Sequence, residues 1–277
     1  MNETISVLSI LNIIIACLVG IALPIGMLIF GAAKLKADIR AFLAGGAVYI
    51  LFVVIIEAAF QGFVFSTSFG DTILENLSFL AVYDGFVAAL FEEIGRLLVF
   101  CTILRPLMKR DVNALMYGAG HGGVEAMVVL GFSMINNLIW TYYINTGKMD
   151  VLTSGITKDA LTAVENMIRE FLDTPGYLYL LGTLERIFTV VVQIALSVFV
   201  WFAVKKKKVR YFVMAFLCHM LMTTGAEMLR MSELNPVLAQ VCIGLMTAAV
   251  AFLAKWVWKK NARSSISASD AEFSPQP

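Results

Sequence analysis

Residues 81–104 read AVYDGFVAALFEEIGRLLVFCTIL, an apolar run that carries Glu92, Glu93 and Arg96 near its middle. The run is long enough to cross a bilayer, because a membrane-spanning helix needs about 20 residues. An ionisable side chain at the centre of a bilayer costs about 3 kcal/mol on insertion scales. We therefore expect these three side chains to face polar partners inside a helix bundle.

The composition of the whole chain is that of an integral membrane protein. Hydrophobic residues make up 60% of it and charged residues 15%, whereas a soluble domain carries about 25% charged residues. Seven apolar stretches predict an all-α, polytopic transmembrane bundle that forms one domain over residues 1–260. The predicted spans cover residues 5–30, 41–60, 81–104, 112–144, 176–204, 209–230 and 236–258. Residues 261–277, rich in serine and alanine, are predicted to be a disordered tail.

Lysine and arginine gather after the first, third, fifth and seventh predicted spans. These clusters are Lys34, Lys36 and Arg40; Arg105, Lys109 and Arg110; Lys205 to Lys208 and Arg210; and Lys255, Lys259, Lys260 and Arg263. With seven crossings all four clusters fall on one side, which the positive-inside rule makes the cytoplasm. The pattern predicts a multi-pass protein of the cell (plasma) membrane with its N-terminus outside and its C-terminus in the cytoplasm. Nothing in it indicates a nucleic-acid partner.

Two connections are expected to contain structure of their own. Residues 145–175 form the long polar loop, and its apolar residues from Leu161 to Leu172 recur at helical spacing. Thr157 is a suitable N-cap and Thr174-Pro175-Gly176 a stop signal. The loop therefore predicts an amphipathic helix on the outer surface, either a packing cover or a gate over a cavity. Residues 61–80, aromatic and half polar, are typical of an interfacial or re-entrant segment.

Four polar side chains from four spans are predicted to share one depth. Counting from the cytoplasmic end of each span at 1.5 Å per residue places Glu93, His121, Gln193 and His219 about 13–16 Å deep. That level is near the midplane of a hydrocarbon core of about 30 Å. Chance would align one pair readily but four positions rarely, so we expect these side chains to meet.

Spacing along the helices suggests how acid and base are divided among these groups. Glu92 and Arg96 are four residues apart and Glu93 and Arg96 three, so Arg96 can neutralise one glutamate and leave the other free. Two neighbouring carboxylates cannot both carry charge cheaply in a low dielectric. A free carboxylate in that setting is suited to act as a general base.

A metal site is the second prediction from the spacing. His121 and Glu125 are four residues apart on one helical face and can bind a metal jointly. Adding Glu93 and His219 gives a candidate zinc-binding set. Glycines around His121 would let neighbouring helices approach closely.

Structural roles without catalysis are also open for several of these residues. A Glu–Arg pair in a membrane bundle is often structural, and a single histidine often only forms hydrogen bonds. Glu185 and Arg186 can neutralise each other within the fifth span. Glu57 and Glu227 lie near the outer ends of their spans and are expected to be solvated.

The motifs and their order resemble the CAAX prenyl protease and bacteriocin-immunity superfamily, most closely its YhfC branch of membrane peptidases. They are Glu92-Glu93-x-x-Arg96, Tyr117-x-x-x-His121, His121-Gly-Gly-x-Glu125, Glu185-Arg186 and the solitary His219. The resemblance covers most of residues 5–230. Two features depart from the prenyl-protease form. The Glu-Glu to Arg spacing is one residue shorter, and Thr223 stands where that form has Asn or Asp.

The resemblance implies a residue-by-residue assignment. Glu92 or Glu93 would act as general base on a water, with Arg96 as their partner. His121 and His219 would bind a metal, for which zinc is the expectation, or would orient the water and the oxyanion directly. Apart from what the resemblance implies, Gln193, Glu185 and Thr223 are candidate supporting side chains.

The favoured hypothesis is an intramembrane endopeptidase that depends on zinc and acts on a membrane-bound protein or peptide. Amide hydrolysis needs an activated water and stabilisation of an oxyanion, and a zinc site supplies both. A proton-coupled transporter is an alternative, because buried Glu, Arg and His also form proton relays. A haem protein with two axial histidines and a non-catalytic peptide-binding or immunity protein are further alternatives.

Overall fold

The protein is described by a computed structural model that covers residues 4–155 and 157–272. All regular structure in these two ranges is helical, as predicted. The elements are α1 (Val7–Ala33), α2 (Ile39–Val48), the π-helix η1 (Tyr49–Glu57), α3 (Ala58–Phe65), α4 (Ser68–Leu74), α5 (Leu77–Cys101), the 3-10 helix η2 (Arg105–Lys109), α6 (Val112–Ala126), the π-helix η3 (Met127–Phe132), α7 (Ser133–Asn145), α8 (Met149–Thr153), α9 (Lys158–Asp173), α10 (Tyr177–Lys205), α11 (Val209–Met231) and α12 (Pro236–Glu272).

The prediction of about seven spans is confirmed, with shifted boundaries. Among the described residues, six helices are long and apolar enough to cross a membrane, and α4 with α5 is a seventh candidate bent by 114°. α2, η1 and α3 run on as one span over Ile39–Phe65, longer than predicted. The short helix α4 and the bend before α5 fall in the segment predicted to be interfacial or re-entrant. α12 continues to Glu272, within the predicted tail, and residues 273–277 lie outside the described ranges.

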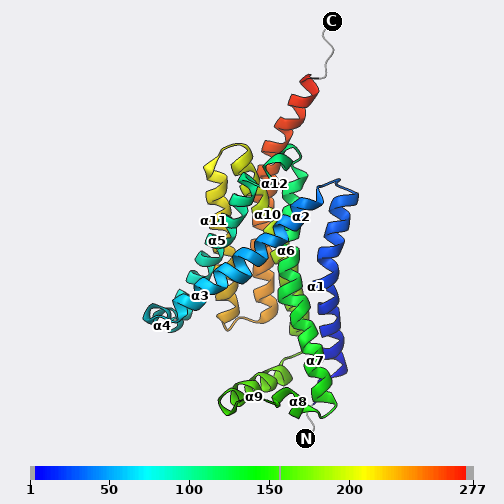
Figure 1. Ribbon diagram of the computed structural model, residues 1–277, viewed down its shortest axis with the longest axis vertical. Coiled ribbons are helices and arrows are strands. Elements are labelled where there is room, and N and C mark those ends of the chain that lie inside the picture. The colour runs from blue at the N-terminus through cyan, green and yellow to red at the C-terminus, as the bar shows by residue number, and fades with distance from the viewer. Residues whose placement is uncertain (1–3, 156, 273–277) are drawn as a thin grey trace.

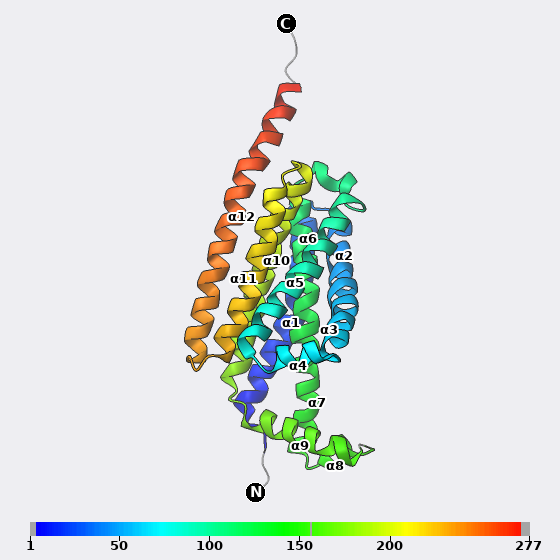
Figure 2. The same cartoon turned by 90° about the vertical axis from the view of Figure 1, so that its left-hand side faces the viewer.

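The long helices run mainly along the long axis of the molecule, and the two termini lie at opposite ends (Figures 1 and 2). The connections α1–α2, α5–α6 and α10–α11 lie at the end from which α12 projects (Figure 1). The basic clusters in these connections therefore share one end of the bundle, which we call the basic end. That this end faces the cytoplasm stays a prediction.

Aromatic side chains pack closely around α10. They fill the interior of the bundle between the mid-depth polar residues and the basic end. Trp201, on α10, is fully buried and meets the ring of Phe100 edge to face, with centroids 5.2 Å apart. Phe100 meets Tyr117 of α6 in the same way at 4.6 Å. The Trp201 indole N–H donates to Asp111 Oδ1 at 2.9 Å, so its polar atom is satisfied. This aromatic contact between α5, α6 and α10 sets how deep the polar residues of those helices lie.

The glycines around His121 allow the close helix contacts that the sequence predicted. A Cβ atom added to Gly120 would lie 2.0 Å from the backbone oxygen of Phe42 in α2. In the other direction, a Cβ on Gly45 would lie 2.2 Å from the backbone oxygen of Tyr117. α2 and α6 are therefore in backbone contact beside His121, and no larger residue fits at either position.

Gly120→Ala is accordingly expected to destabilise the bundle by about 1–3 kcal/mol, the usual cost of overpacking. The neighbouring atom belongs to backbone, so it cannot move aside as a side-chain tip would. Gly26→Ala in α1 is the matched control, because nothing lies within 4 Å of a Cβ added there. Thermal unfolding of the two purified variants in detergent measures the difference. Equal unfolding temperatures would contradict this packing.

The predicted amphipathic helix is confirmed as α9, with Thr157 as its N-cap and Thr174 as its C-cap. Its apolar face is packed against the bundle: Ile168 and Phe171 are buried, and the Phe171 ring lies 6.0 Å from that of Trp140 on α7. This packing agrees with the role of a cover. The membrane side on which it lies stays a prediction.

Candidate active site

Four helices bring the predicted mid-depth residues together. α5 carries Glu92, Glu93 and Arg96, α6 carries His121, α10 carries Gln193 and α11 carries His219. All six side chains are buried, and Glu93, Arg96 and His121 have no exposed surface. We call these six residues the inner cluster.

Glu92 lies between the two imidazoles. His121 Nε2 is 2.9 Å from Glu92 Oε2, and His219 Nε2 is 3.6 Å from Glu92 Oε1. Gln193 Nε2 donates to the same Oε2 atom at 2.8 Å. Within the described residues Glu92 has no arginine partner in an ion pair, so it is the carboxylate of the two that no guanidinium neutralises.

Glu93 is the carboxylate that Arg96 neutralises, as the spacing allowed. The Arg96 guanidinium forms an ion pair with Glu93 Oε1 and also donates to Gln193 Oε1 at 2.5 Å. His219 Nδ1 lies 2.8 Å from Glu93 Oε1. Because a carboxylate accepts, His219 carries its proton on Nδ1, and its Nε2 is available toward Glu92. Glu93 therefore orients a histidine and does not stand free.

Several polar atoms of this region are buried without a hydrogen-bond partner among the described residues. They are His121 Nδ1, Glu93 Oε2, Arg96 Nε and Tyr117 Oη. Buried polar atoms are nearly always paired, and exceptions are frequent at functional sites. The inner cluster thus retains unused donors and acceptors that a reacting group can engage.

Glu125 belongs to a second polar cluster next to the inner one. Its carboxylate accepts from Gln193 Nε2 at 3.1 Å and from Arg186 at 3.3 Å. The predicted pair of Glu185 and Arg186 is present at 2.9 Å. Sequence reasoning missed Arg230 of α11, which also forms an ion pair with Glu185. No local spacing links residues so far apart in the chain, so packing alone reveals this contact.

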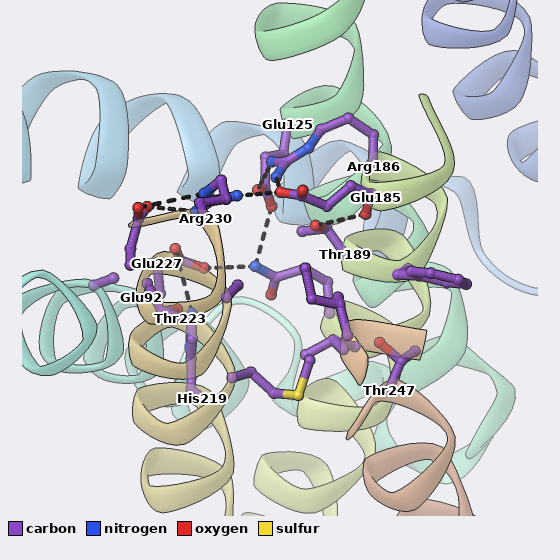
Figure 3. Close-up of a pocket in the computed structure, with 17 residues that line it drawn as sticks. Glu92, Glu125, Glu185, Arg186, Thr189, His219, Thr223, Glu227, Arg230 and Thr247 are labelled. Atoms are coloured by element: carbon purple, nitrogen blue, oxygen red, sulfur yellow. Dashed lines mark hydrogen bonds and ion pairs between the residues drawn. The ribbon is translucent and has the colours of Figure 1, made fainter. Parts of the chain in front are cut away.

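One cavity connects the two clusters (Figure 3). It has a volume of about 240 Å³, and its lining includes Glu92, His219 and Thr223. It extends along α11 to Glu227 and Arg230, near the end of that helix remote from the basic end. Thr223, predicted as a supporting residue, thus shares the cavity with Glu92. A substrate that reached Glu92 by this route would pass the charged side chains first.

Glu57 was expected to be solvated, and that expectation is wrong. Its side chain is buried, and Gln61 Nε2 donates to its Oε1 at 3.0 Å. The span continues past Glu57 to Phe65, so this residue does not lie at an end of the helix. Glu227 is closer to expectation, partly exposed and paired with Arg230.

The donor chemistry of the inner cluster suits zinc, although the side chains do not surround one point. Two imidazole nitrogens and one carboxylate, from His121, His219 and Glu92, are a ligand set that catalytic zinc accepts. The Glu93 contact to His219 Nδ1 is the kind that orients a metal-bound histidine. Yet among the described residues no group of three or more His, Cys, Asp or Glu side chains is placed to hold a metal ion. The predicted ligands Glu93 and Glu125 are engaged by Arg96 and Arg186.

Comparison with known proteins agrees with the motif pattern. The family model described as YhfC intramembrane metalloprotease matches residues 19–243. An uncharacterized membrane protein YhfC of Bacillus subtilis (strain 168) is 29% identical over 242 residues, or 86% of this chain and 90% of that protein. No solved structure matches the chain. The matched range includes all six residues of the inner cluster.

Proposed function

We propose, because this chain belongs to the YhfC intramembrane metalloprotease family, that it hydrolyses peptide bonds of membrane-associated proteins or peptides with a water activated by Glu92. The observation that carries the proposal is the position of the Glu92 carboxylate, buried between two imidazoles and lining a cavity. A carboxylate held in this way is placed to take a proton from water without a competing cation.

The residues of the inner cluster divide the chemistry as follows. Glu92 accepts a proton from the water while the water oxygen forms a bond to the carbonyl carbon, and the carbonyl electron pair moves onto oxygen. His219 Nε2, oriented through Glu93, accepts a hydrogen bond from the same water. His121 Nε2–H donates toward the developing oxyanion. Glu92 then gives its proton to the leaving nitrogen as the C–N bond breaks, which yields an acid and an amine.

The second part of the proposal is that the inner cluster binds zinc. The imidazoles of His121 and His219 would hold it, with Glu92 left unbound as the base on the water, and His121 would lose its Nε2 proton, as metal ligands do. A bound zinc would polarise the carbonyl and lower the pKa of the attacking water.

The size of the cavity favours an extended substrate segment. An α-helix with its side chains is about 10–12 Å across, and a cavity of about 240 Å³ cannot enclose one. We therefore propose that a membrane-bound peptide unwinds locally and presents a short extended stretch to Glu92. Thr223 and Gln193 are the polar side chains placed to contact that stretch.

The test is cleavage by the purified full chain in proteoliposomes that contain a library of single-span peptides. Mass spectrometry of the products is expected to show new termini within the spans with the wild type, and none with His219→Ala. Zinc is measured on the same samples, with about one ion per chain expected. Absence of products from the folded wild type would overturn the peptidase proposal. Cleavage by metal-free protein would overturn only its zinc part.

A further inference from the structure

A second surface feature lies at the basic end, well away from the inner cluster. A groove of about 550 Å³ lies between η2 and the end of α10. Its lining has four basic side chains, Arg105, Lys109, Lys205 and Lys207, and no acidic one. Lys205 is bound to Asp111 Oδ1 at 2.5 Å. The other three form no ion pair within the part of the chain that the structure describes. The groove therefore carries positive charge that the protein does not neutralise.

The rest of the groove's lining is apolar. Cys101, Pro106, Met108 and Val204 complete its lining. Exposed apolar side chains continue from it along α5, where Leu98 is 49% exposed, and in the turn that follows, where Ile103 is 70% exposed. In a spanning protein such side chains face acyl chains. A ligand that fits this surface has both an anionic group and a hydrocarbon portion.

Lys207 reaches the groove from an unusual backbone conformation. Its φ is 54°, in the left-handed region, where a helix C-terminus usually has glycine. The amide of the next residue, Lys208, donates to Ala203 O at 2.9 Å and closes the turn. A lysine at such a position is strained relative to glycine.

We propose that this groove binds the phosphate headgroup of an anionic phospholipid, with an acyl chain along the exposed face of α5. The cations match the headgroup, and the apolar part of the lining matches the glycerol and acyl portion. Basic pockets between spanning helices near the membrane surface bind anionic lipid headgroups by the same physics. A free phosphate ion would leave the apolar surface unused. The site is independent of the proposed peptidase activity.

The test uses the full chain in a neutral detergent with dioleoylphosphatidylglycerol, followed by native mass spectrometry. The wild type is expected to retain this lipid at least about tenfold better than dioleoylphosphatidylcholine. The groove variant Arg105→Gln/Lys109→Gln/Lys207→Gln is expected to lose that preference. The control Lys34→Gln/Lys255→Gln/Lys259→Gln removes the same charge at the same end, outside the groove, and is expected to keep it. Equal loss in both variants would overturn the site.

A single substitution separates binding from folding. Lys207→Gly keeps the left-handed turn and relieves its strain, so the chain should be at least as stable to heat as the wild type. It is nevertheless expected to retain phosphatidylglycerol about threefold to fivefold less well. Unchanged retention would overturn the role of Lys207. Displacement of the lipid by inorganic phosphate at equal concentration would overturn the acyl-chain contact.

Discussion

Glu92→Gln is expected to lower the rate of peptide cleavage by about 10²- to 10⁴-fold, the usual range for loss of a general base. Glutamine keeps the size of the side chain and one oxygen that accepts from His121 Nε2, now 2.9 Å from the carboxylate. It cannot take a proton from water. The variant should therefore fold and bind a substrate peptide while failing to turn it over.

The measurement is the initial rate of release of a product peptide in proteoliposomes, with thermal unfolding recorded on the same samples. Glu75→Gln is the matched control, since Glu75 is an exposed carboxylate at the end of α4 and is expected to leave the rate unchanged. A folded Glu92→Gln variant with a rate within twofold of the wild type would rule out Glu92 as the base.

Glu93→Gln should behave differently, and the comparison decides a choice that the sequence left open. The pattern Glu92-Glu93-x-x-Arg96 allows either glutamate to pair with arginine, because both spacings lie on one helical face. The structure pairs Arg96 with Glu93 and directs Glu92 at the imidazoles. Glu93→Gln is therefore expected to lower the unfolding temperature more than Glu92→Gln does, and to lower the rate of peptide cleavage less. Both quantities are measured on the same proteoliposome samples.

The convergence of these polar side chains was predictable from the sequence, whereas their individual contacts were only partly so. Counting residues from the basic ends of the spans placed Glu93, His121, Gln193 and His219 at one level, because helical rise is fixed. Rotation about each helix axis is set by packing and cannot be counted. His121 and Glu125 illustrate this limit. They share a helical face, yet His121 contacts Glu92 while Glu125 contacts Gln193 and Arg186.

The ends of the helices were the second feature that the sequence did not predict well. Glu57 looked like a residue at the end of a span because the polar composition changes just after it. In the structure η1 passes directly into α3, so Glu57 is interior and Gln61 satisfies it. A π-helical stretch alters which side chains share a face, and no residue pattern in this segment signals it. The contact of Arg230 with Glu185 was likewise beyond local spacing.

Arg96→Met is expected to cause the largest loss of stability among single substitutions in the inner cluster. Arg96 and Glu93 have no exposed surface, and the guanidinium also donates to Gln193 Oε1. Removing it leaves the Glu93 carboxylate buried with only an imidazole beside it. Removing one partner of a buried ion pair costs about 3–5 kcal/mol.

The double variant Glu93→Gln/Arg96→Met distinguishes an electrostatic cause from lost packing. It removes both charges and keeps side chains of similar size, and replacing a buried pair by uncharged groups is often close to neutral. We therefore expect it to unfold at a higher temperature than Arg96→Met alone, with a coupling of about 1–3 kcal/mol in the mutant cycle. Lys259→Met, at an exposed position of α12, controls for loss of a cation and should change stability by less than about 0.5 kcal/mol. Strict additivity in the cycle would mean that Arg96 does not neutralise Glu93, and Glu92 would then lose its distinction as the free carboxylate.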